Sequence, residues 1–106
     1  MVILPIVPIT QPFMSAERSL KLLVAGRVQG VGFRYFARSR AARHGVRGYV
    51  RNLADGRVEV VAQAGEAALA AFIEDLRVGP RTGAVRECRT EPLDGTDSYD
   101  DFTIRF

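Results

Sequence analysis

Apolar residues recur at regular intervals from residue 20 onward, and the interval changes along the chain. Residues 20–25 form a short apolar run that ends at a glycine, which predicts a central β-strand. Residues 33–44 place their apolar side chains on one helical face and arginines elsewhere, and Gly45 stands where a left-handed C-terminal cap would be expected. This segment is therefore predicted to be the first helix.

The middle of the chain predicts a hairpin followed by a second helix. Residues 46–53 and 57–63 are extended runs, and the Asp55-Gly56 pair between them is a turn signal. Four apolar residues then follow at the i, i+3, i+4 and i+7 spacing of an amphipathic helix, which Gly79-Pro80 ends: Leu69, Phe72, Ile73 and Leu76.

Two further strands complete the pattern. Residues 82–90 are extended, and in residues 99–106 apolar and polar side chains alternate as in a half-buried final strand. The order is therefore βαββαβ plus one strand. Two helices separated by a hairpin predict an α+β sandwich, with an antiparallel sheet, both helices on one of its faces and an added fifth strand at the C-terminus.

The first residues do not fit this pattern. Residues 1–13 are apolar, but three prolines interrupt a continuous helix, and the run is too short to span a membrane. A secretory signal is not evident either. We expect residues 1–19 to be an extension outside the fold and residues 20–106 to be the domain. Whether translation starts at Met14 or the extension is a genuine tail stays open.

Composition narrows the class of protein. A chain of 106 residues and 11.7 kDa, with 47% hydrophobic and 25% charged residues, is typical of one globular domain. The single cysteine, Cys88, excludes an internal disulfide and has no clustered partners for a zinc site. We therefore expect a cytoplasmic protein without a metal site. The small size of the chain and the absence of an obvious extra apolar face predict a monomer.

Positive charge is concentrated in one stretch. Residues 27–57 contain eight arginines and one acidic residue, Asp55, so their net charge is 8 − 1 = +7 when all are ionised. Because arginine can donate paired hydrogen bonds to carboxylate or phosphate oxygens, an anionic ligand is indicated. Charge alone does not distinguish a small phosphate from a nucleic acid.

The glycine-rich segment GRVQGVGFR joins the first strand to the first helix. Glycines there allow backbone N–H groups to converge on an oxyanion, and the helix N-terminus adds positive potential. Arg34 is the last residue of this segment and can clamp a phosphate. The segment matches neither of the two common glycine patterns of nucleotide-binding loops.

Two segments together resemble the acylphosphatase family. GRVQGVGFR at residues 26–34 is similar to the family's first signature, and GYVRNLADGRV at residues 48–58 is similar to its second. The resemblance extends over about residues 20–106. One departure is visible, since Ala64 occupies a position that is usually glycine; we expect it to change the entry to the second helix without affecting the chemistry.

The resemblance implies a fold, an activity and a set of site residues. The fold would be a ferredoxin-like sandwich, and the activity would be hydrolysis of acyl phosphates to a carboxylate and phosphate, without a metal or cofactor. Arg34 would bind the phosphoryl group and Asn52 would position the attacking water. Loop 26–32 would hold the phosphate, with substrate-binding positions at Gln29, Gly30, Val31, Gly32 and Phe33, although the side chains of Gln29, Val31 and Phe33 are expected to serve as scaffold.

Two other readings stay open at this point. RNA-recognition domains share the βαββαβ order, but they stack bases on aromatic residues of two central strands, and residues 20–25 and 57–63 contain no aromatic residue. We therefore expect no nucleic-acid partner. Similar domains are also fused to larger carbamoyl-transfer proteins, and a free-standing enzyme is the simpler expectation.

Overall fold

The structure is a computed structural model that describes residues 17–94 and 97–106. Its elements follow the chain in the order β1 (Arg18–Arg27), α2 (Phe33–His44), β2 (Arg47–Asn52), β3 (Val58–Ala64), α3 (Glu66–Val78), β4 (Ala84–Pro92) and β5 (Phe102–Arg105). The predicted extension lies largely outside the described residues, and the first strand begins at Arg18, two residues before the predicted domain boundary.

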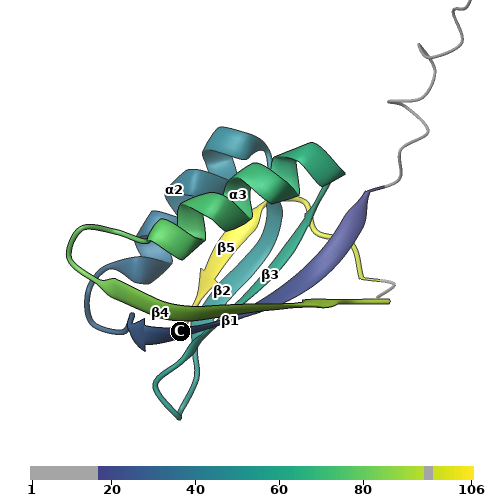
Figure 1. The fold of residues 1–106 in the computed structure, drawn as a ribbon. Helices are drawn as coiled ribbons and strands as arrows, with labels where there is room; N and C mark the ends of the chain where they lie inside the picture. Colours follow the sequence, from purple (N-terminus) through teal and green to yellow (C-terminus); the bar gives the residue numbers. More distant parts are fainter. Residues whose placement is uncertain (1–16, 95–96) are drawn as a thin grey trace, which may run out of the picture.

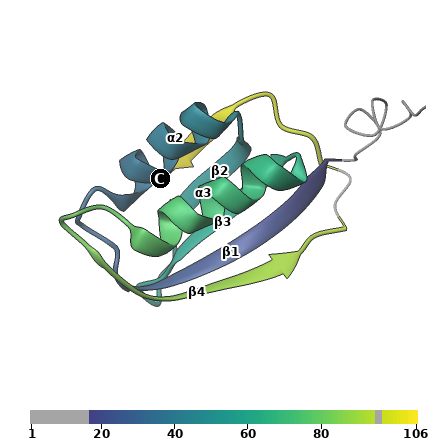
Figure 2. The same ribbon diagram turned by 45° about the horizontal axis from the view of Figure 1, so that its top comes forward.

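The strands form one sheet in the order β4-β1-β3-β2-β5. β1 pairs antiparallel with β3 and β4, and β2 pairs antiparallel with β3. β5 instead lies parallel to β2, so the sheet is mixed. Both helices cover the same face (Figure 1), and a view tilted toward them shows α2 and α3 side by side over the strands (Figure 2). The predicted α+β sandwich with a fifth strand is confirmed.

The core lies between this helical layer and the sheet. α2 contributes Phe33, Ala37 and Ala41, all of which are buried, and its two alanines allow the helix to approach the sheet closely. α3 contributes Leu69, Phe72 and Leu76 at the predicted spacing. All seven residues of β3 are buried, because the helices cover one face of this central strand and side chains of its neighbours β1 and β2 crowd the other.

The ends of the helices also follow the sequence signals. Gly45 adopts φ 72° and ψ 32°, and its N–H donates to the carbonyl of Ala41, which closes α2 with the predicted left-handed cap. His44 in the last turn contacts α3, with Nε2 2.8 Å from Oδ2 of Asp75. This histidine therefore links the two helices.

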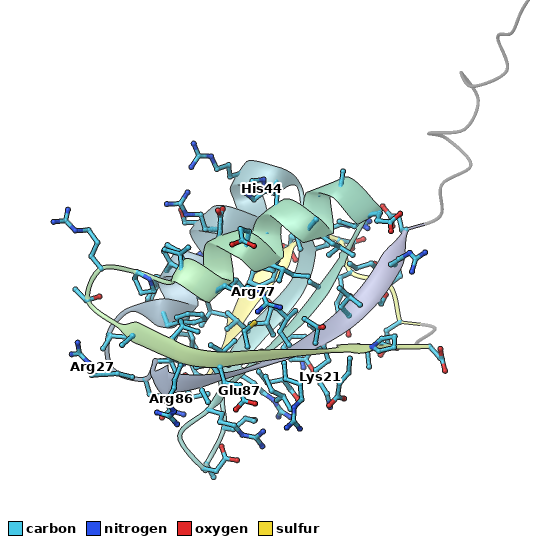
Figure 3. The ribbon with its side chains drawn as sticks, in the orientation of Figure 1. Lys21, Arg27, His44, Arg77, Arg86 and Glu87 are labelled. Carbon is cyan, nitrogen blue, oxygen red and sulfur yellow. The ribbon has the colours of Figure 1, made fainter. Side chains whose placement is uncertain are left out.

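The opposite face of the sheet is polar. Lys21 on β1 and Glu87 on β4 point away from the helices (Figure 3). On the same face Arg51 donates from Nε to Glu59 Oε1 at 2.7 Å, across the β2–β3 pair. Paired charges of this kind are suited to a sheet face that no helix covers.

Candidate active site

The loop between β1 and α2 holds its shape through two glycines. Gly30 has φ 74° and Gly32 has φ 80°, a region that residues with a side chain rarely adopt. Gly32 is the N-cap of α2, and its carbonyl accepts the hydrogen bond from Phe36 N at 3.0 Å. The chain therefore turns into the helix at this point, so that the loop and the positive end of the helix dipole lie together.

Gln29 fastens this loop to the hairpin between β2 and β3. Its side-chain Nε2 donates to the carbonyl of Leu53 at 2.8 Å and to the carbonyl of Arg57 at 2.9 Å. Both acceptors lie in the hairpin connection, one of them directly after Asn52. A single carboxamide thus sets the distance between the glycine-rich loop and the last residue of β2.

A small hollow lies where the loop, the start of α2 and the end of β2 meet. Its volume is about 90 Å³, and it is lined by Val28, Gly30, Gly32, Phe33, Arg34, Tyr35 and Asn52. The structure therefore brings Arg34 and Asn52, which are 18 positions apart in sequence, to one site.

Asn52 carries an unsatisfied polar atom at this hollow. Its Oδ1 is buried and has no hydrogen-bond partner within the described part of the chain. An unpaired buried carbonyl oxygen costs about 1–3 kcal/mol, so such an atom needs an explanation. A guest molecule that donates a hydrogen bond to Oδ1 would supply the missing partner.

Arg34 is held by the C-terminal strand. Its Nη1 donates to the carbonyl of Arg105 at 3.2 Å, and its guanidinium carbon lies 4.6 Å from the centre of the Phe106 ring. An arginine has five N–H donors, so most of them stay available for an anion. The first turn of α2 contains no acidic residue, which leaves the positive potential of the helix end uncompensated there.

The turn of the hairpin is stabilised by its own side chains. Asp55 Oδ1 accepts from the backbone N–H of Arg57 at 3.0 Å, and its Oδ2 accepts from Arg57 Nε at 2.9 Å. The backbone N–H of Arg57 is the main cause that lowers the pKa of Asp55, and the Arg57 side chain adds to it. Asp55 thus shapes the connection that Gln29 grips, and it does not line the hollow.

The predicted binding positions separate into two groups. Gly30, Gly32 and Phe33 line the hollow, whereas Gln29 and Val31 are not among its lining residues. The Gln29 side chain binds the hairpin, and the Val31 carbonyl accepts from Thr82 Oγ1 at 2.7 Å. The Phe33 side chain is buried in the core. The expected scaffold role of these three side chains agrees with their placement.

Sequence reasoning missed four residues at the site. Val28 and Tyr35 line the hollow. Arg105 and Phe106 contact Arg34 from a strand about seventy positions away. Tyr35 could have been found as the neighbour of Arg34 on the first helical turn. Nothing local in the sequence indicates that β5 returns beside β2 and reaches α2.

Residues 17–94 and 97–106 contain no group of three or more His, Cys, Asp and Glu side chains that could hold a metal ion. In the same part of the chain no helix is long and apolar enough to cross a membrane.

Comparison with known proteins places the chain in a family. The family model for acylphosphatase matches residues 20–104. The acylphosphatase of Thermotoga petrophila is 43% identical over 89 residues, which are 84% of this chain and 98% of that protein. The crystal structure of acylphosphatase from Bacillus subtilis superimposes with a TM-score of 0.81 at 34% identity, covering 86% of this chain and all of that one.

A second solved structure, an acylphosphatase from Coxiella burnetii, matches with a TM-score of 0.79 at 35% identity and covers 84% of this chain and 93% of that one. The residues matched by the family model include both signature segments. The chain belongs to the acylphosphatase family.

Proposed function

We propose that the hollow at the start of α2 is the active site of an acylphosphatase, in which this chain hydrolyses the carboxyl–phosphate bond of small acyl phosphates. The observation that carries the proposal is the juxtaposition of Arg34, the glycine-rich loop and the unpartnered Oδ1 of Asn52 around one hollow. A phosphoryl group offers acceptor oxygens to Arg34 and to the loop, and a water molecule can supply the donor that Asn52 Oδ1 lacks.

Binding of the phosphoryl group follows from the donors at the hollow. Backbone N–H groups of the loop and of the first residues of α2 would hold its oxygens, and the guanidinium of Arg34 would add paired, charge-assisted hydrogen bonds. Because the negative charge of the transferring group spreads over its equatorial oxygens, donors fixed in advance stabilise the transition state without reorganising.

Asn52 would position the attacking water. A water that donates one hydrogen to Asn52 Oδ1 keeps a lone pair free for the phosphorus atom. The new bond forms between the water oxygen and phosphorus, while the bond from phosphorus to the carboxyl oxygen breaks and its electron pair leaves with the carboxylate. Both protons of the water end on the product, which leaves as dihydrogen phosphate beside the carboxylate. Since a carboxylate is a good leaving group, positioning and charge stabilisation are sufficient without a dedicated nucleophile.

The oligomeric state, the compartment and the partner belong to the same proposal. We propose that a monomer is the catalytic unit and that it acts in the cytoplasm on a small molecule. We propose no nucleic-acid partner, because β1 and β3 carry no aromatic residue on which bases could stack.

Hydrolysis of benzoyl phosphate by the purified full-length chain tests the proposal. Loss of an oxyanion donor costs about 10² to 10³ in rate, so Arg34→Ala should lower kcat by at least that factor. Asn52→Ala should lower kcat with a smaller change in KM, because it removes a contact to water and not to the substrate.

Arg43→Ala is the matched control, because Arg43 is an exposed arginine in the last turn of the same helix. It should retain wild-type rates. Turnover no faster than in buffer, or wild-type rates in both site variants, would contradict the proposal.

A further inference from the structure

Large apolar side chains are rarely exposed in the described part of this protein. Three exceed the exposure expected of such residues: Tyr35 at 54%, Val78 at 74% and Phe106 at 89%. Two of these three border the proposed active site. Tyr35 lines the hollow, and the Phe106 ring stacks against Arg34. Two exposed aromatic residues next to the site, one lining the hollow and one against Arg34, offer apolar surface to a ligand that extends beyond the hollow.

The size of the hollow explains why such a surface is needed. Pockets that enclose a whole organic ligand have volumes of about 300–1,000 Å³, whereas this hollow measures about 90 Å³. It has room for the phosphoryl end of a substrate and little more. The acyl half must then lie outside, against the side chains that surround the opening.

The surroundings of Arg34 determine what kind of acyl group fits there. The Phe106 ring lies on one side of the Arg34 guanidinium, with 4.6 Å between the guanidinium carbon and the ring centre. Tyr35 is the next residue on α2, and its ring is 5.3 Å from the guanidinium carbon of Arg38. Each of the two exposed rings therefore lies against a guanidinium group, one at Arg34 and one at Arg38. A planar apolar acyl group stacks well on such surfaces.

We propose that Tyr35 and Phe106 form the acyl-binding rim of the site and make the enzyme selective for acyl phosphates whose acyl group is aromatic. The inference rests on the proposed function. It adds the substrate class, for which the loop and the two signatures carry no indication.

The test compares benzoyl phosphate with acetyl phosphate in the full-length protein and its variants. For each protein, kcat/KM for benzoyl phosphate is divided by kcat/KM for acetyl phosphate. The wild-type ratio divided by the variant's ratio gives a quotient in which the intrinsic reactivities of the two substrates cancel. We expect this quotient to be about 10 for Tyr35→Ala and for Phe106→Ala, which corresponds to about 1.4 kcal/mol. Tyr35→Phe, which keeps the ring, should leave the quotient near 1.

Val78→Ala is the control for loss of an exposed apolar side chain, because Val78 does not line the hollow. It should also leave the quotient near 1. Phe106→Ala additionally disturbs Arg34 and so should slow both substrates; only the quotient reports on the acyl group.

The possible failures can be told apart. If neither substrate is hydrolysed, the proposed function is wrong. If both are hydrolysed and the quotient stays near 1 in Tyr35→Ala and Phe106→Ala, the function stands and the acyl-binding rim is refuted. Faster turnover of an acyl phosphate that carries a free carboxylate than of benzoyl phosphate would also overturn the inference if Arg38→Ala abolished the difference. That result would assign the rim to anion binding.

Discussion

The contact that Gln29 makes with the hairpin offers the sharpest test of how the site is built. In Gln29→Glu an amide NH₂ that donates to two carbonyls, at 2.8 and 2.9 Å, is replaced by a carboxylate of the same shape. Each hydrogen bond contributes about 1 kcal/mol net, so the variant should lose about 2 kcal/mol of unfolding free energy. Repulsion between the carboxylate and the two carbonyl oxygens adds to this loss.

Urea and thermal unfolding at pH 7 measure the effect. For a domain of this size 1 kcal/mol corresponds to about 4–8 °C, so the expected fall in Tm is at least about 8 °C. Because the loop would no longer be fixed relative to Asn52, kcat should fall as well. Gln29→Met, which loses the hydrogen bonds without adding a charge, should lie between the wild type and Gln29→Glu in stability.

The pH dependence gives the same prediction an internal check. Two carbonyl oxygens facing the introduced carboxyl favour its protonated form, so its pKa in the folded protein should exceed that in the unfolded chain. The destabilisation is then present above that raised pKa and is relieved as pH falls through it. A Gln29→Glu variant as stable and as active as the wild type at pH 7 would refute the role assigned to this side chain.

Three further substitutions or reactions probe the scaffold. A Cβ at Gly48, where φ is 140°, would lie 1.9 Å from the carbonyl oxygen of Val61. Gly48→Ala should therefore lose at least about 3 kcal/mol of unfolding free energy in urea, and a loss under about 1 kcal/mol would contradict the close approach of β2 and β3. His44→Gln removes the 2.8 Å contact to Asp75 and should cost about 1 kcal/mol, and unchanged stability would show that this contact does not hold α2 to α3. Burial raises the pKa of the Cys88 thiol, an effect that Arg77 partly offsets, so iodoacetamide at pH 8 should alkylate the native chain several-fold more slowly than the urea-unfolded chain, whereas equal rates would contradict that burial.

Much of the fold could be predicted because its signals are local. The spacing of Leu69, Phe72 and Leu76 marks the buried face of α3, and Gly45 marks the end of α2, so both helices follow from the sequence. β4 is harder to delimit: it runs two residues later than predicted, because an edge strand with exposed residues on both faces shows little periodicity.

The site could be predicted only in part, because some of its contacts join segments that are far apart in the sequence. Arg34 and Asn52 lie in recognisable segments, and the structure places them at one hollow. The contact between Arg34 and the carbonyl of Arg105 depends on β5 lying parallel to β2, which is a property of the assembled sheet. Sequence spacing carries no signal for such a long-range contact, and it equally gives no signal for the size of the hollow.

Titration of the ¹⁵N-labelled full-length chain with inorganic phosphate would show whether the hollow binds a phosphoryl group, because phosphate is a product of the proposed reaction. We expect saturable shifts of the backbone amides of Gly30, Gly32 and Arg34 and of the Asn52 side-chain amide, and their loss in Arg34→Ala. Shifts that centre instead on the polar face of the sheet around Lys21 and Tyr49, or no saturable shift at all, would contradict the proposed phosphate site.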